Sequence, residues 1–390
     1  MTRVLVVCGE ASGDLLAGGV VRSLKQLDPG VQVSGLGGMH CREAGAETIW
    51  DVRELSVMGI AEVLPKLRRI LGIMSEIVQY ARDVRPDVAL LVDAPDFNLR
   101  LAKRLKKLGI RVVSYVSPTV WIWRQGRVRT IARYVDALCC ILPFEEAWLR
   151  QRGVPATFVG HPLLERQPSD ELVAGLRREL LAQSSGPILA LLPGSRRYEI
   201  DHLLPPMLGA ARLLANQFPG LEVVLPVAPT IGREVIERHC ADAGFAPRLI
   251  DGQAREVLGA ADAALVASGT ATLEATLARA PSVVVYRVSF LTELVFRLIV
   301  RARFISLPNI LAGEEIVPEI LQGAVVPETL AARVAPLLQA TPERALMVKR
   351  LAAVRASLGE PGASVKVAST VLRYALPAPA AVGVLPTLAG

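Results

Sequence analysis

Short β-branched stretches alternate with helical patterns along most of the 390 residues, and this alternation limits the possible folds more than any other feature. Strand-like stretches of the first half lie at 4–7, 31–36, 88–92, 111–116, 137–142 and 156–159. Those of the second half lie at 188–192, 222–226, 248–250, 263–266 and 283–286. Strands that alternate with helices form βαβ units around parallel sheets. We therefore predict an α/β protein with two Rossmann-like, doubly wound parallel-sheet domains that face a cleft.

The polar segment 161–186 separates the two halves. We predict an N-terminal domain at 1–165, a C-terminal domain at 166–344, and a flexible tail at 376–390, where Ala and Pro are frequent and charge is absent. Ligands of open α/β sheets bind beyond the carboxyl ends of the strands. Motifs that follow a strand are therefore the candidates for function.

Composition excludes several classes of protein. Hydrophobic residues make up 52% of the chain and charged residues 21%, which excludes a disordered protein. The five cysteines have no paired metal spacing, so we expect a reducing compartment, no metal and no cofactor. We also expect neither a secretory signal nor a membrane-spanning helix, because no apolar stretch reaches about 18 residues.

Positive charge is concentrated in the first half. The net charge is +7, and residues 1–160 carry 22 basic and 16 acidic side chains. Such an excess suits nucleic acid, an anionic membrane or an anionic substrate. The helical pattern at 61–74 mixes apolar residues with Lys66, Arg68 and Arg69. It fits either a core helix or a helix that lies on anionic lipid.

Carboxylates surround two strand ends in the first half. Glu10 follows the first strand and is a candidate base or sugar ligand, while Ser12 either caps the next helix or helps to bind an anion. Asp87 precedes the strand at 88–92, and Asp93 and Asp96 follow it. Asp93 and Asp96 could equally cap the next helix. A carboxylate near others tends to have a raised pKa, which suits a general base.

Three further stretches suggest binding. Residues 115–124 hold two of the four tryptophans, and Ser117 and Trp121 are candidates to line a sugar or acyl pocket, with core packing as the alternative. Arg196 follows the strand at 188–192 in a Gly-Ser-Arg loop that suits phosphate. After the strand at 263–266, Ser268, Gly269 and Thr270 open a helix that suits a diphosphate. Glu274 lies one turn further on, where it suits a ribose diol.

Together these motifs resemble the lipid-A-disaccharide synthases. The matching stretches follow in order at 9–14, 55–60, 93–98, 115–124, 142–145, 158–163, 192–196, 267–274 and 307–313. An ordered series over about residues 3–340 is more specific than any single motif. The resemblance implies a glycosyltransferase of the GT-B fold, in which helices at 345–375 join the first domain.

The resemblance also implies a reaction in lipid A biosynthesis. UDP-2,3-diacylglucosamine and 2,3-diacylglucosamine 1-phosphate (lipid X) would give the β-1′,6-linked disaccharide 1-phosphate and UDP with inversion. We assign Asp96 as the general base, Glu10 as the second candidate, and Asp93 and Asp87 as carboxylates that shape the site. The residues expected to bind substrate are Ser12, Ser117, Trp121, Arg196, Ser268, Gly269, Thr270, Glu274 and, as a weaker candidate, Asn309.

Acylated substrates imply contact with a membrane. We expect a cytoplasmic protein that binds peripherally to the anionic cytoplasmic face of the inner membrane, and the resemblance allows a homodimer. A nucleic-acid partner is not expected, because clustered carboxylates repel phosphate. Two alternatives stay open: another UDP-sugar enzyme of the same fold, such as a non-hydrolysing epimerase, and a non-catalytic binding protein.

Overall fold

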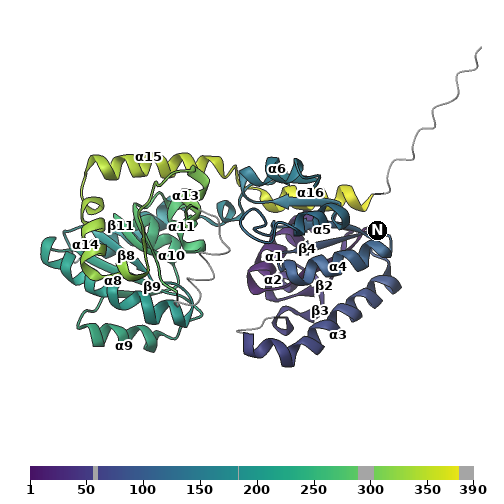
Figure 1. Cartoon of the computed structure of the whole chain (residues 1–390), viewed down its shortest axis with the longest axis horizontal. Coiled ribbons are helices and arrows are strands. Elements are labelled where there is room, and N and C mark those ends of the chain that lie inside the picture. The colour runs from purple at the N-terminus through teal and green to yellow at the C-terminus, as the bar shows by residue number, and fades with distance from the viewer. Residues whose placement is uncertain (56–59, 183, 289–302, 377–390) are drawn as a thin grey trace, which may run out of the picture. The chain divides into compact units, whose positions relative to one another are not determined.

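The computed structural model describes residues 1–55, 60–182, 184–288 and 303–376, and for 60–67 only the course of the helix. The predicted tail therefore lies almost wholly outside the described residues. The chain forms two compact units (Figure 1): unit 1 is Met1–Pro162 with Pro361–Gly390, and unit 2 is Leu163–Glu360. Of the segment 345–375, only the part from Pro361 onward lies in unit 1.

Unit 1 contains a seven-stranded parallel sheet in the order β3-β2-β1-β4-β5-β6-β7. Its strands are β1 (Arg3–Cys8), β2 (Gln32–Gly37), β3 (Glu47–Asp51), β4 (Val88–Val92), β5 (Arg111–Tyr115), β6 (Ala137–Cys140) and β7 (Ala156–Phe158). Its α-helices are α1 (Ala11–Leu27), α2 (Met39–Glu43), α3 (Ile60–Val84), α4 (Pro95–Lys107), α5 (Arg127–Tyr134), α6 (Pro143–Arg150) and α16 (Ala363–Ala375), and η1 (Val52–Glu54) is a 3₁₀ turn.

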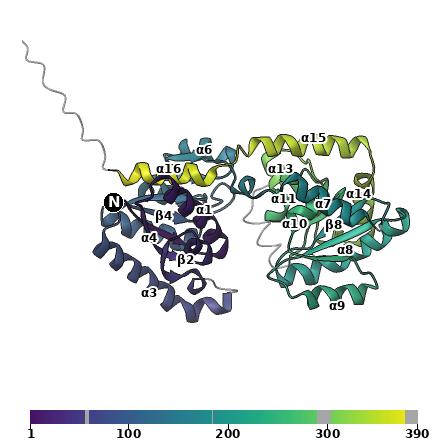
Figure 2. The ribbon, with the colours of Figure 1, turned by 180° about the vertical axis from the view of Figure 1, so that it is seen from behind.

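Helices cover both faces of this sheet, as the two opposite views show (Figures 1 and 2). Alternate residues of β1 point to opposite faces. Val4 and Val6 pack with α1 and α16, whereas Leu5 and Val7 pack with α3, α4, α5 and α6. The C-terminal helix α16 is therefore part of the core of unit 1.

Unit 2 repeats this architecture with a six-stranded parallel sheet in the order β10-β9-β8-β11-β12-β13. Its strands are β8 (Ile188–Leu192), β9 (Glu222–Val227), β10 (Arg248–Asp251), β11 (Ala263–Ala267), β12 (Ser282–Tyr286) and β13 (Glu319–Leu321). Its described α-helices are α7 (Asp170–Leu181), α8 (Arg197–Gln217), α9 (Arg233–Ala243), α10 (Ala254–Ala260), α11 (Thr270–Ala278), α13 (Leu307–Ala312), α14 (Pro327–Val334) and α15 (Pro342–Ser357). Its 3₁₀ turns are η2 (Pro162–Arg166), η3 (Gln322–Ala324) and η4 (Ala335–Leu338), and the first residue of η2 is the last of the N-terminal segment of unit 1.

Two hydrophobic clusters hold unit 2 together. One face of the sheet packs against α8, α9, α14 and α15, and the other against α7, α10 and α11. The predicted pair of doubly wound parallel-sheet domains is thus confirmed. In each sheet the strand order reverses once, between β1 and β4 in unit 1 and between β8 and β11 in unit 2. Ligands of such sheets bind beside this reversal. We therefore expect binding at the carboxyl ends of β1 and β4 in unit 1 and of β8 and β11 in unit 2.

Candidate active site

A hollow of about 590 Å³ lies at the carboxyl ends of β8, β9, β10 and β11 in unit 2. All five residues that we predicted to hold a nucleotide diphosphate or its ribose line it: Arg196, Ser268, Gly269, Thr270 and Glu274. The strand order explains this, because β8 and β11 are neighbours in the sheet although 70 residues of chain separate the two strands. The structure therefore brings together two loops that each carried only weak evidence in the sequence.

The loop after β8 differs from our expectation in one respect. Glu199 accepts hydrogen bonds from the backbone N–H groups of Ser195 (2.9 Å) and Arg196 (3.2 Å), so these donors are already occupied by a carboxylate. Gly194 has φ +116°, and a Cβ there would lie 2.2 Å from the carboxylate of Glu199. The Arg196 side chain is 83% exposed and lies 3.5 Å from Glu199. In this loop the Arg196 guanidinium is therefore available to bind an anion, whereas the backbone N–H groups are not.

The loop after β11 offers backbone donors instead. Gly269 has φ +144°, a conformation that side chains rarely adopt, and it places α11 directly after the strand. The first N–H groups of a helix have no acceptor within the helix. Those of Thr270 and Ala271 open α11 at the wall of the hollow. Together with the positive end of the helix dipole, they favour a bound anion.

Glu274 lies further along α11, and burial raises its pKa. The positive charges of Arg255, whose Nε lies 3.7 Å from the Glu274 carboxylate, and of Arg166 counteract this rise, and Arg255 has the larger effect. We did not single out Arg255 from the sequence, although it lines the hollow. Its signal was weak, since it is one of many arginines and only the sheet order brings it to Glu274.

Asn309 does not have the substrate-binding role that we predicted for it. It is fully buried, and its amide group donates to the carbonyl of Val317 and to Glu319, both at 2.8 Å. Its oxygen accepts from the N–H groups of Ile316 (2.7 Å) and Val317 (3.0 Å). An amide has two donors and two lone pairs, so no capacity is left for a substrate. Asn309 holds the segment before β13 in place.

In unit 1, the carboxyl ends of β1 and β4 lie against each other. A Cβ built on Gly9 would lie only 2.1 Å from the Cβ of Ala94, and one on Gly13 would lie 3.8 Å from the Cβ of Asp93. Glu10 is the N-cap residue of α1, yet its side chain makes no capping hydrogen bond. Glu10 and Ser12 are both exposed. The structure therefore brings the Glu10 loop and the Asp93 loop together.

The turn after β4 has an unusual backbone. Asp93 (φ +54°) and Ala94 (φ +44°) are both left-handed, which is rare for residues with a side chain and marks functional turns. The Asp93 carboxylate accepts from the N–H of Ala94 (2.8 Å), and burial raises the pKa of Asp93. Asn98 clamps the turn by donating to the carbonyls of Val92 and Asp93.

Asp96 lies in the first turn of α4, and its side chain is 70% exposed. It pairs with Arg124 at 3.1 Å and with Arg127. The sequence motifs predict neither arginine as a site residue. Both fix the carboxylate at the mouth of a groove between α4 and α5.

Asp87 likewise lies away from the site that we predicted it to shape. It lies before β4, whereas Asp93 and Asp96 follow this strand. Five residues of strand span about 16 Å, so Asp87 lies at the opposite edge of the sheet. There its carboxylate accepts a hydrogen bond from the N–H of Arg3 (2.8 Å). Asp87 joins β1 to β4 and takes no part in the site.

The aromatic loop after β5 is anchored by a carboxylate that we did not predict. Glu145 of α6 is buried and accepts from the indole N–H of Trp121 at 3.3 Å. The Trp121 ring also packs edge-on against Phe144, and Ser117 is buried. Trp121 and Ser117 thus fix the loop from inside, and Trp123, 41% exposed, is the aromatic that faces solvent.

Burial raises the pKa of Glu145 to about 7, and hydrogen bonds from Leu142, Trp121 and Ser117 oppose this rise. Two sequence signals were available: Glu145 ends one of the stretches that carry the family resemblance, and Pro143 starts a helix with an acidic residue two positions later, which is typical of a helix N-terminus. Neither signal reveals that the carboxylate is buried.

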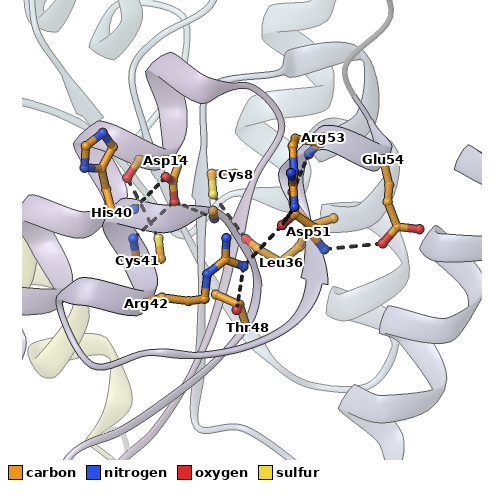
Figure 3. A network of polar contacts seen from close by, with 11 residues as sticks. Cys8, Asp14, Leu36, His40, Cys41, Arg42, Thr48, Asp51, Arg53 and Glu54 are labelled. Carbon is orange, nitrogen blue, oxygen red and sulfur yellow. Dashed lines mark hydrogen bonds and ion pairs between the residues drawn. The ribbon is translucent and has the colours of Figure 1, made fainter.

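Asp14 does not cap its own helix. Its carboxylate crosses to the start of α2, where it accepts from the N–H groups of Gly38 (2.6 Å), His40 (2.9 Å) and Cys41 (3.2 Å) (Figure 3). Burial alone would raise the pKa of Asp14, but these bonds and Cys41 lower it overall. Asp14 therefore fixes the β2–α2 turn.

Cys8, Asp14 and Cys41 are the one cluster of possible metal ligands among the described residues (Figure 3). The oxygens of Asp14 are already hydrogen-bonded, and the Cys8 thiol lies 3.1 Å from the carbonyl of Leu36. Contact with Cys8 and burial raise the pKa of Cys41, which disfavours the thiolate that a metal requires. This donor set therefore suits a packed core rather than a metal.

The helix that we considered for lipid contact is only partly described. Residues 56–59, and the side chains of Val63, Leu64 and Lys66, lie outside the described part. Further along α3, Met74 is buried in the core, and Arg69 pairs with two glutamates. Within the described residues, no helix is long and apolar enough to cross a membrane.

The chain is similar to known proteins over most of its length. The model of the lipid-A-disaccharide synthetase family matches residues 4–364. A lipid-A-disaccharide synthase of Myxococcus xanthus is 50% identical over 375 residues, which cover 96% of this chain and 98% of that protein. One of Escherichia coli is 43% identical over 337 residues, which cover 86% of this chain and 88% of that protein.

Solved structures support the fold. A UDP-GlcNAc 2-epimerase from Neisseria meningitidis, bound to UDP-GlcNAc, aligns with a TM-score of 0.63 at 13% identity over 95% of this chain and all of the other. Acinetobacter baumannii MurG aligns with a TM-score of 0.59 at 16% identity over 96% of this chain and all of the other. These likenesses confirm the GT-B architecture. From the family match and the relatives, we conclude that the chain belongs to the lipid-A-disaccharide synthase family of glycosyltransferases.

Proposed function

We propose that the chain joins UDP-2,3-diacylglucosamine to 2,3-diacylglucosamine 1-phosphate in one inverting displacement. The observation that carries the proposal is the hollow of unit 2, where an exposed guanidinium, a helix N-terminus and a half-buried carboxylate lie beside the strand reversal. These groups suit a diphosphate and a ribose diol. Membership of the family supports synthesis of the lipid A disaccharide, and the identities of the two lipids follow from the resemblance.

Unit 2 would hold the donor. Arg196 and the N–H groups of Thr270 and Ala271 would bind the diphosphate, and Glu274 would accept hydrogen bonds from the ribose. When the bond between the sugar carbon and the diphosphate breaks, its electron pair moves to a phosphate oxygen of UDP. The same donors then stabilise the new charge, which lowers the barrier.

Unit 1 would supply the base. In this proposal the Asp96 carboxylate takes the proton of the acceptor 6-hydroxyl, while that oxygen bonds to the anomeric carbon of the donor. Asp96 suits this role by its position, because its carboxylate is exposed and Arg124 and Arg127 fix where it lies. Glu10 is the second candidate, and Asp93 shapes the turn that carries Asp96.

We also propose that the enzyme works at the cytoplasmic face of the inner membrane, because both substrates are acylated. Residues 1–160 have an excess of positive charge, which favours anionic lipid. Sedimentation with phosphatidylglycerol vesicles should show binding at low salt that weakens as salt rises. A homodimer stays a proposal that rests on the family resemblance, and sedimentation velocity would test it.

The reaction is tested by UDP release from purified protein with UDP-2,3-diacylglucosamine in detergent micelles. We expect release only when 2,3-diacylglucosamine 1-phosphate is present, together with a disaccharide product. Release without the acceptor would indicate hydrolysis. Conversion of unacylated UDP-sugars, with no reaction of the lipids, would support the epimerase alternative.

A further inference from the structure

A groove of about 570 Å³ runs between α4 and α5 in unit 1. It is distinct from a small cavity that Asp93 lines. Asp96 is the one acidic residue that lines the groove. Six cationic residues also line it: Arg100, Lys103, Arg124, Arg127, Arg129 and Arg133. So strong an excess of one charge in a hollow attracts an oppositely charged ligand.

The cations of the groove fall into two groups. Arg124 and Arg127 pair with Asp96 at one end. The other four make no ion pair with any residue that the structure describes: Arg100, Lys103, Arg129 and Arg133. Arg100 and Lys103 lie one turn apart on α4, and Arg129 and Arg133 lie one turn apart on α5. Like charges so placed repel one another, and a bound dianion removes that repulsion.

The spacing along α4 suits a phosphorylated sugar. Arg100 follows Asp96 by four residues, which is a rise of about 6 Å along the helix. A hexose has comparable length between its 6-hydroxyl oxygen and a phosphate on C1. A sugar whose 6-hydroxyl meets Asp96 would therefore place its phosphate among the four unpaired cations.

We infer that this groove is the binding site for the phosphate monoester of the acceptor sugar. The inference rests on the proposed function, because Asp96 serves as the base there. It assigns the basic groove to a substrate, whereas the sequence alone suggested only a general attraction to anionic lipid. A hollow with a carboxylate at one end suits a single sugar phosphate better than a flat layer of lipid headgroups.

The kinetic test combines Arg100→Gln with Arg133→Gln, one from each wall of the groove. The control combines Arg104→Gln with Lys107→Gln, which remove two exposed charges of α4 that do not line the groove. We expect the groove variant to raise the KM for 2,3-diacylglucosamine 1-phosphate at least tenfold and to leave the KM for the donor unchanged. With 2,3-diacylglucosamine, which lacks the phosphate, groove variant and wild type should be equal. Equal losses with both acceptors, or an equal loss in the control, would overturn the inference.

A binding test separates this inference from the proposed reaction. Calorimetry with acyl-free glucosamine 1-phosphate and with glucosamine needs no turnover. We expect the wild type to prefer the phosphorylated sugar and the groove variant to lose that preference. No preference in the wild type would overturn the inference even if the transferase reaction is observed. A groove variant that kept the preference would also overturn the inference, and an equal loss of vesicle binding in the groove variant and the control would then assign these charges to membrane attraction.

Discussion

The two strand reversals occupy equivalent places in similar sheets, yet they present opposite chemistry. In unit 2, the loops after β8 and β11 leave a hollow of about 590 Å³, with glycines at positive φ and an exposed arginine. In unit 1, the loops after β1 and β4 touch at Gly9 and Ala94, and carboxylates take the exposed positions. One edge is thus suited to hold an anion and the other to accept a proton. A shared topology positions a site, whereas the residues after each strand decide its chemistry.

The largest expected effect is on turnover, and it distinguishes the role of unit 1 from that of unit 2. Asp96→Ala removes the proposed base, so kcat should fall by about 10²–10⁴-fold. Binding of UDP, which depends on unit 2, should not change. Turnover is measured by UDP release and binding by calorimetry.

Asp87→Asn is the matched control, because it changes an aspartate at the other end of the same strand. It should cost about 1 kcal/mol of stability and little rate. If Asp96→Ala kept most of its rate while Glu10→Gln lost it, the base would be Glu10.

The second prediction concerns the buried carboxylate of unit 1. The pKa of Glu145 is about 7 in the folded protein and about 4.5 when it is unperturbed. The folded state therefore binds more protons between these values, so this group costs stability as pH rises from about 4.5 through about 7. Glu145→Gln cannot ionise. It should gain stability relative to wild type by up to about 3 kcal/mol between pH 4.5 and pH 8, as measured by urea unfolding.

His161 provides a control of opposite sign. Burial lowers its pKa to about 4, below the unperturbed 6.5, so the unfolded state binds more protons between these values. Its contribution rises with pH over this range. His161→Gln should therefore lose stability relative to wild type as pH rises from 4 to 6.5. A Glu145→Gln difference that did not vary with pH would mean that Glu145 titrates normally.

Sequence predicts strand ends better than it predicts side-chain directions. Alternating patterns placed Arg196, Ser268 and Glu274 after strands, and the parallel sheet of unit 2 then brought them to one hollow. Asp87 was wrongly grouped with Asp93, although the five-residue strand between them already implied opposite edges.

Other features depend on packing that no local pattern reveals. The sequence placed Trp121 and Trp123 in one loop, but only the structure shows that the first is anchored to Glu145 and the second is exposed. Likewise, nothing in its motif shows that Asn309 uses its whole hydrogen-bonding capacity internally.

The third prediction tests how unit 2 recognises the ribose of the donor. Glu274→Ala removes the proposed ribose acceptor and should weaken UDP binding at least about tenfold, since a hydrogen bond to a charged group contributes about 1.5–3 kcal/mol. The wild type should bind 2′-deoxy-UDP more weakly than UDP. Glu274→Ala should bind the two nearly equally, because the acceptor for the hydroxyl is missing. If the variant still discriminated fully, the ribose would have another partner.

The smallest effect concerns the carboxylate that occupies the loop after β8. Glu199 accepts from Ser195 and Arg196 at the wall of the hollow, so its negative charge opposes a bound diphosphate. Glu199→Gln keeps an acceptor oxygen and removes the charge. UDP affinity should therefore rise about twofold to fivefold at low salt, and the gain should shrink as salt screens the charge. Glu328→Gln, the same change on α14 away from the hollow, should leave the affinity unchanged. A loss of affinity in Glu199→Gln alone would instead show that the loop needs this carboxylate to hold Arg196 in place.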